Sequence, residues 1–259
     1  ISASRRERSI TRDYEGREIL ELLQNANDAA AELGTKSRVL IKLTEHGLIV
    51  ANTGAPFTTG GVTSLRLSNF SPKTGRVQFI GNKGLGFRAV LNWSSSPIIL
   101  SGSLSLAYGE RVALHHQEEL CRQSADVRRA VQREQAIGQI RVVPILTFPD
   151  YHENGDLDPN ALDDPSAHIL DHCRKLRRDN YETAIGMPFD RLEAFEHAKE
   201  QMLRLRPEIL LFVANLQEIR IECDGGEPIV WKREDDGMVS TILRNDKPLR
   251  SWKIFNKSE

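Results

Sequence analysis

Long apolar runs, closely spaced cysteines and an excess of one charge are all missing from this chain. Its 259 residues carry a net charge of −1, so no overall charge attracts it to nucleic acid or to a membrane surface. No apolar stretch reaches the roughly 18 residues that a membrane-spanning helix needs. The three cysteines are about fifty residues apart, which argues against a disulfide framework or a zinc site. We therefore expect reduced thiols, a cytoplasmic location, no membrane contact and no direct nucleic-acid contact.

Residues 13–34 have the pattern of an amphipathic helix with an unusual polar side. Glu21, Asn25 and Asp28 are spaced i, i+4 and i+7, which places their side chains in one narrow stripe. The stripe holds two carboxylates and a carboxamide, and we expect no cation to pair with them. An amide oxygen suits a hard cation such as Mg²⁺, and a carboxylate can take a proton from water. The alternative is a surface helix whose polar residues have this spacing by chance.

Two later segments add a strand end and a glycine-rich loop. Residues 48–56 have the pattern of a short strand followed by a turn, and Asn52 stands at the strand end. Residues 79–91 place three glycines and a lysine before an apolar helical pattern. The backbone N–H groups of such a loop can bind phosphate oxygens. It is not a Walker loop, because it has no terminal Gly-Lys pair followed by Ser or Thr, and it is a poor dinucleotide fingerprint.

In this order, the three motifs resemble those of the GHKL superfamily of ATPases, which includes heat-shock chaperones, gyrase B and sensor histidine kinases. The likeness is strongest to the chaperone branch and its sacsin-like ATP-binding domains. It implies an α/β fold: a two-layer sandwich of a mixed β-sheet with helices on one face. It also implies Mg²⁺-dependent binding and slow hydrolysis of ATP by a conformational switch within a larger protein. Glu21 supplies a base for hydrolysis, and no histidine precedes His46 to accept a phosphoryl group. Hydrolysis is therefore favoured over phosphotransfer to protein.

The resemblance also assigns roles to individual residues. Glu21 matches the catalytic glutamate that orients and deprotonates the attacking water. Asn25 matches the asparagine that ligates Mg²⁺, and Thr183 matches a late-strand threonine that helps to hold adenine through water. The expected nucleotide-binding residues are Asn25, Asp28, Asn52, Gly54, Lys73, Gly81, Asn82, Lys83, Gly84, Leu85, Gly86, Phe87 and Thr183.

Asn52 departs from the family pattern, which usually has an aspartate that accepts a hydrogen bond from the adenine amino group. The carboxamide oxygen of Asn52 can also accept that bond, but the amide can flip and donate to a guanine oxygen instead. Preference for adenine over guanine therefore stays open at this point.

The order of the motifs also predicts the domain organisation. We expect an ATP-binding domain over residues 1–220, with a lid over the nucleotide at about 57–80, and the β-rich start of a following domain over 221–259. The expected partners are ATP or ADP, downstream domains of the same protein, and a second copy of the chain on ATP binding. Sacsin-like modules occur in chaperone-like and bacterial defence proteins. A nucleotide-binding scaffold, or a client-binding module with little hydrolysis, is the alternative function.

Overall fold

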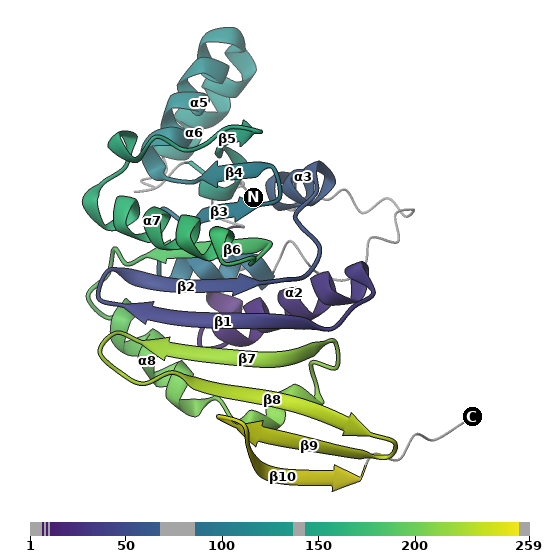
Figure 1. Ribbon diagram of the computed structural model, residues 1–259. Coiled ribbons are helices and arrows are strands. Elements are labelled where there is room, and N and C mark those ends of the chain that lie inside the picture. Colours follow the sequence, from purple (N-terminus) through teal and green to yellow (C-terminus); the bar gives the residue numbers. More distant parts are fainter. Residues whose placement is uncertain (1–6, 8, 10, 68–85, 137–142, 254–259) are drawn as a thin grey trace.

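The structure, a computed structural model, describes residues 7, 9, 11–67, 86–136 and 143–253. Its strands form one ten-stranded sheet in the order β10-β9-β8-β7-β1-β2-β6-β3-β4-β5 (Figure 1). The strands are β1 Ser37–Thr44, β2 Gly47–Asn52, β3 Ile98–Ser101, β4 Leu104–Ala107, β5 Asp150–Glu153, β6 Thr183–Pro188, β7 Leu216–Cys223, β8 Ile229–Asp236, β9 Val239–Arg244 and β10 Lys247–Lys253. The helices are α2 Glu18–Leu33, α3 Thr59–Leu67, α5 Glu110–Gln123, α6 Ala125–Ala136, α7 Asp164–Arg178 and α8 Ala194–Arg204, with short 3-10 helices η1 Phe87–Asn92, η2 Ile145–Thr147, η3 Pro159–Ala161 and η4 Pro207–Leu211.

The sheet is mixed because β1 pairs in parallel with β7 and antiparallel with β2. The other described strand pairs are antiparallel. Parallel pairing of β1 and β7 requires a long crossover, and all of the chain between residues 44 and 216 provides it. This result confirms the predicted α/β class with a mixed sheet.

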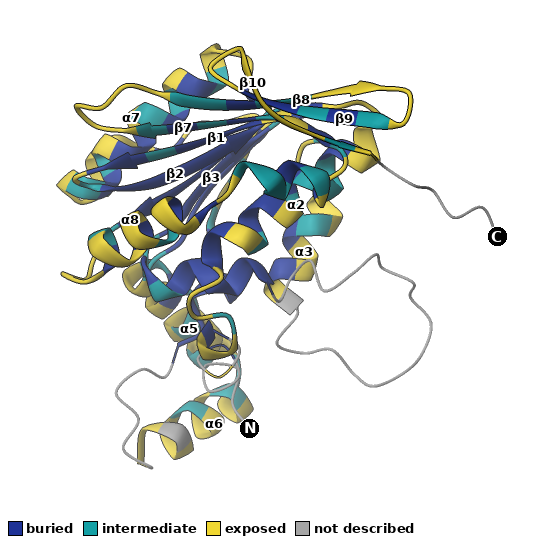
Figure 2. Ribbon diagram, turned by 90° about the horizontal axis from the view of Figure 1, so that it is seen from below, coloured by how far each residue is buried: buried dark blue, intermediate teal, exposed yellow. Residues whose placement is uncertain are grey.

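Successive side chains of each strand point to opposite faces of the sheet, so the core is divided between the two faces. Val39 and Ile41 of β1 pack into the larger core, with α2 and α8, whereas Leu40 packs into a smaller core with α7. Figures 1 and 2 agree that α2 and α8 cover one face and α7 the other. The expected helical layer on one face is therefore present, and α7 adds a helix to the opposite face.

The motif helix is shorter than the predicted range 13–34, because the chain turns at Gly16 before α2 begins. Gly16 has a φ of 82°, a left-handed conformation that favours glycine, and its N–H donates to Glu18 Oε1 at 3.2 Å. The helix ends at Gly34, also left-handed with a φ of 72°, whose N–H bonds to carbonyl oxygens of the last turn. A glycine at each end thus fixes the length of α2.

The predicted domain boundary between residues 220 and 221 falls inside β7. Strands β8, β9 and β10 continue the same sheet, and Trp231 and Ile242 pack into the larger core. The described part of the predicted second domain, residues 221–253, therefore shares the sheet and the core of the first. Of the predicted lid, residues 57–67 contain α3, and residues 68–80 lie outside the described residues. Among the helices that the structure describes, none is both long and apolar enough to cross a membrane.

Candidate functional site

Helix α2 presents the polar stripe as the sequence predicts. Glu21, Asn25 and Asp28 are all half-buried, and their helix packs its other side, with Leu22, Leu23 and Ala26, into the core. In the described part of the chain, the side chains of Asn25 and Asp28 have no hydrogen bond or ion pair. Half-buried polar groups without a protein partner are suited to a ligand.

One expectation about this stripe is wrong, because Glu21 does have a cationic partner. Arg17 lies one turn earlier, and its Nη2 is 3.3 Å from Glu21 Oε1. The side chain of Arg17 is 61% exposed, so solvent screens the pair and its contribution to stability is small. The Glu21 side chain is only 13% exposed, and its other oxygen, Oε2, faces the third motif.

The third motif meets the first at Gly86, which caps η1. A Cβ built on Gly86 would lie well inside 3.0 Å of Glu21 Oε2 and 3.2 Å from its Cδ. The backbone of Gly86 is ordinary right-handed helix, with φ −62° and ψ −35°. Glycine is therefore needed here for space rather than for conformation, and its absent side chain lets the carboxylate approach the end of the glycine-rich loop.

The second motif meets the first at Gly54. A Cβ at this position would lie 2.8 Å from the backbone of Ala29 and Ala30 in α2. The next residue, Ala55, donates its N–H to the carbonyl oxygen of Ala29 at 2.9 Å. The turn after β2 is therefore pressed directly onto the helix that carries the polar stripe.

Asn52 and Thr183 are brought together by strand pairing. They are direct partners across β2 and β6, and Thr183 in turn faces Ser101 across β6 and β3. The residues two positions along these strands, Val50, Ile185 and Ile99, belong to the larger core. Asn52, Thr183 and Ser101 therefore form a polar row on the face that α2 covers, and each is almost completely buried.

Hydrogen bonds orient the side chains of this row. Asn52 Oδ1 accepts from the N–H of Gly54 at 3.0 Å, and the hydroxyls of Ser101 and Thr183 are 2.6 Å apart. Ser101 Oγ also accepts from the N–H of Phe57 at 2.8 Å. Sequence reasoning missed Ser101, because a serine at the end of an apolar strand has no distinctive signal until the strand register is known.

A buried ion pair supports the residues that follow Gly86. Arg88 Nη1 lies 3.3 Å from Glu7 Oε2, and both side chains are almost completely buried. The Glu7 carboxylate also accepts from the N–H groups of Ile145 and Leu146, at 2.9 and 3.0 Å. Burial lowers the pKa of Arg88, and the charge of Glu7 opposes that shift. Sequence reasoning missed this pair, although Arg88 lies within the third segment, directly after Phe87.

Arg88 and Phe87 also connect this region to α3 and to the segment before it. Arg88 Nη2 donates to the carbonyl oxygen of Leu65 at 3.0 Å. The ring of Phe87 is buried and meets the ring of Phe57 edge to face, with centroids 6.4 Å apart. Of the other predicted residues, Lys73, Gly81, Asn82, Lys83, Gly84 and Leu85 lie outside the described residues.

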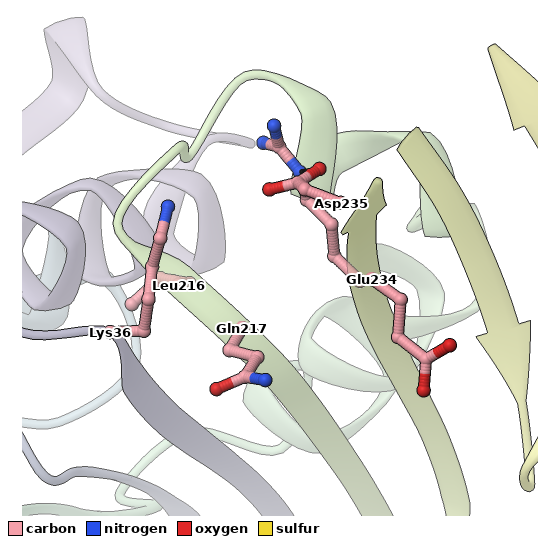
Figure 3. Close-up of a pocket in the computed structure, with 6 residues that line it drawn as sticks. Lys36, Leu216, Gln217, Glu234 and Asp235 are labelled. Atoms are coloured by element: carbon pink, nitrogen blue, oxygen red, sulfur yellow. Dashed lines mark hydrogen bonds and ion pairs between the residues drawn. The ribbon is translucent and has the colours of Figure 1, made fainter. Parts of the chain in front are cut away.

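A cavity of about 330 Å³ lies away from these residues, where β7 and β8 pass the start of β1 (Figure 3). Its cations already have protein partners: Lys36 donates to the carbonyl oxygen of Ala214, and Arg233 Nε donates to Asp235 Oδ1 at 2.8 Å. The residues around it are Lys36, Leu216, Gln217, Arg233, Glu234 and Asp235. None of the predicted site residues is among them.

Comparison with known proteins finds distant similarities. No known family profile matches the chain. Protein NO VEIN of Arabidopsis thaliana is 24% identical over 203 residues, which are 77% of this chain and 6% of that protein. The chain thus spans a small fraction of this relative. The B-subunit of DNA gyrase from Myxococcus xanthus aligns with 87% of this chain and 59% of its own, with a TM-score of 0.41 and 11% identity.

Proposed function

We propose that this chain is a Mg²⁺-dependent ATP-binding module of the GHKL type that hydrolyses ATP slowly and acts as a switch within a larger protein. The observation that carries the proposal is that the second and third motifs both contact α2, the helix that carries the first motif. Gly86 abuts the carboxylate of Glu21, and Gly54 abuts the backbone of α2. Asn52, two residues before Gly54, pairs with Thr183. Residues of the second and third motifs thereby adjoin α2, and Thr183 lies beside the second motif across the sheet.

The arrangement separates the site into two ends. The polar row with Asn52 and Thr183 would hold the base, because it offers hydroxyl and amide groups in a nearly dry setting. The stripe of α2 and the backbone at Gly86 would face the phosphates. Mg²⁺, when bound, would neutralise phosphate charge, and Asn25 would supply a protein oxygen to it.

In the proposed mechanism, Glu21 is the general base. Its carboxylate would accept a proton from water as the water oxygen bonds to the terminal phosphorus and the bond to the ADP oxygen breaks. Gly86 leaves room for Oε2, and Arg17 holds Oε1 from the solvent side. A carboxylate in this position, next to the loop, can orient the water.

A scaffold that binds nucleotide with little hydrolysis is the second candidate. The ion pair between Arg17 and Glu21 favours it, because the guanidinium already occupies one oxygen of the carboxylate. A chaperone-like or bacterial defence setting, and a homodimer formed on ATP binding, rest on the family resemblance alone. A turnover measurement separates the enzyme from the scaffold.

The test is Glu21→Gln, which keeps the size of the side chain and removes the base. We expect ATP hydrolysis to fall by about 10²- to 10⁴-fold while ATP affinity stays near the parental value. Phosphate release and isothermal titration measure the two quantities. Arg17→Gln is the matched control, since it removes the partner of Glu21 but leaves the carboxylate. Parental turnover in Glu21→Gln would remove Glu21 from the mechanism, and a parent that does not bind ATP would end the whole proposal.

A further inference from the structure

Three polar groups form a continuous chain of hydrogen bonds beneath the base end of the site. It starts at the backbone N–H of Phe57, passes through Ser101 Oγ and reaches Thr183 Oγ1, with distances of 2.8 and 2.6 Å. Ser101 has no exposed surface and Thr183 is 1% exposed, so water does not compete for these bonds. The chain ends at the threonine that the proposed function places beside the base.

Only one end of this hydrogen-bond chain has a fixed direction. A backbone N–H can only donate, so Ser101 Oγ must accept from Phe57. Between Ser101 Oγ and Thr183 Oγ1, either hydroxyl can be the donor. When Ser101 donates to Thr183, the hydroxyl proton of Thr183 is left to point away from Ser101. An acceptor on the base beside Thr183 would favour this direction, because both hydroxyl protons then have acceptors.

We propose that Ser101 is a positioning residue for base specificity: it fixes the Thr183 hydroxyl as a hydrogen-bond donor toward the bound base. This inference rests on the proposed function and adds to it the base that the site selects. The bond between Gly54 N–H and Asn52 Oδ1 complements it, because an amide flipped by 180° would place two donors against each other. Asn52 thereby keeps its oxygen at this position, and that oxygen retains a second lone pair.

A donor beside an acceptor matches adenine and opposes guanine. The Watson–Crick edge of adenine carries an amino donor next to the ring acceptor N1. Guanine carries a carbonyl acceptor next to an N1–H donor, so both positions are reversed. A Thr183 hydroxyl held as a donor therefore selects adenine, directly or through one water. The hydrogen-bond chain starts at Phe57, in the segment before α3, so selection of the base depends on the position of that segment.

The experiment compares Ser101→Ala with Thr183→Val and with a matched control, Ser105→Ala. Ser105 is a buried serine on the neighbouring strand β4 whose hydroxyl donates to the carbonyl oxygen of Gly155 at 3.0 Å. It faces the opposite side of the sheet, because Leu104 and Leu106 beside it belong to the larger core. Each variant is titrated with ATP and with 1-deaza-ATP, in which a C–H group replaces N1, in competition with a fluorescent ATP analogue.

We expect the parent to bind ATP about two- to tenfold more tightly than 1-deaza-ATP, the usual value of one net hydrogen bond. Ser101→Ala and Thr183→Val should both bring the ratio of the affinities for ATP and 1-deaza-ATP close to one. The double variant should lower this ratio no further. Ser105→Ala should keep the parental ratio. If Ser101→Ala does not fold, Ser101→Cys, with a weaker donor of similar size, should give a reduced ratio.

The outcomes separate this inference from the proposed function. A parental ratio in Ser101→Ala or Ser101→Cys, together with a lost ratio in Thr183→Val, would overturn the role of Ser101 and leave ATP binding intact. A parent that binds ATP and 1-deaza-ATP equally well would also overturn it. Absence of ATP binding by the parent would instead overturn the proposed function.

Discussion

A single methyl group at Gly86 should separate catalysis from stability in this protein. Gly86→Ala adds a Cβ to a backbone that already has right-handed helical φ and ψ, so the substitution introduces no conformational strain. The nearest atoms belong to the end of the Glu21 side chain, with Oε2 well inside 3.0 Å and Cδ at 3.2 Å. The carboxylate, rather than any backbone atom, must therefore move.

The size of the movement follows from these contacts. Ordinary van der Waals contact with a Cβ begins near 3.4 Å, so Oε2 must retreat by about 1 Å. Misplacement of a catalytic group by about 1 Å can cost about 10²-fold in rate. The Glu21 side chain keeps some exposure and has a flexible end, so the protein should absorb the shift without unfolding. We expect turnover to fall by about 10²-fold, with a change in stability within about 0.5 kcal/mol.

The assay is phosphate release at saturating ATP, together with thermal denaturation of the same preparations. Gly109→Ala, just before α5, is the control, because its backbone is extended and a Cβ there would meet no atom within 4 Å. The control should keep its turnover. If Gly86→Ala is as stable and as active as the parent, the approach of the carboxylate to the glycine loop has no part in catalysis.

Three further predictions concern other parts of the fold. Gly54→Ala should lower the free energy of unfolding by about 1–3 kcal/mol, because its Cβ would lie 2.8 Å from the α2 backbone, which cannot move aside. Urea denaturation measures this change, and an unchanged midpoint would contradict the packing. Asn25→Ala should weaken ATP binding about tenfold or more when Mg²⁺ is present and little when it is absent, and equal titrations would exclude Asn25 as a ligand. Burial raises the pKa of Cys173 to about 12, so the folded state keeps a proton that the unfolded thiol loses from about pH 9 upward. Stability should therefore fall between about pH 9 and 12, and urea midpoints of Cys173→Ala should fall less over that range.

The sequence predicts the polar stripe of α2 better than it predicts the surroundings of that stripe. Helical periodicity is local, so the common face of Glu21, Asn25 and Asp28 could be deduced from spacing alone. The partner of Glu21 was also within reach, since Arg17 lies at the i−4 position. By contrast, the approach of Gly86 to Glu21 joins residues 65 positions apart, and no periodicity encodes it.

Strand register explains why other features could not be predicted. Short apolar runs give the positions of β1, β2, β3 and β6, but not their order in the sheet. Only the observed order β2-β6-β3 places Ser101 next to Thr183, and a slip of one residue would turn the serine to the α7 side. The helix α7 on that side was also not anticipated, because a resemblance in three motifs describes only the face that carries them.

Phe57 connects the two ends of the proposed site through different parts of one residue. Its backbone N–H supplies the hydrogen bond to Ser101 and so acts on the base end. Its ring contacts Phe87, directly after the glycine that adjoins Glu21, and so acts on the phosphate end. A displacement of Phe57 would change both contacts together, because the backbone bond and the ring belong to the same residue. In the proposed site, the base end and the carboxylate of Glu21 therefore both depend on the position of the segment that leads into α3.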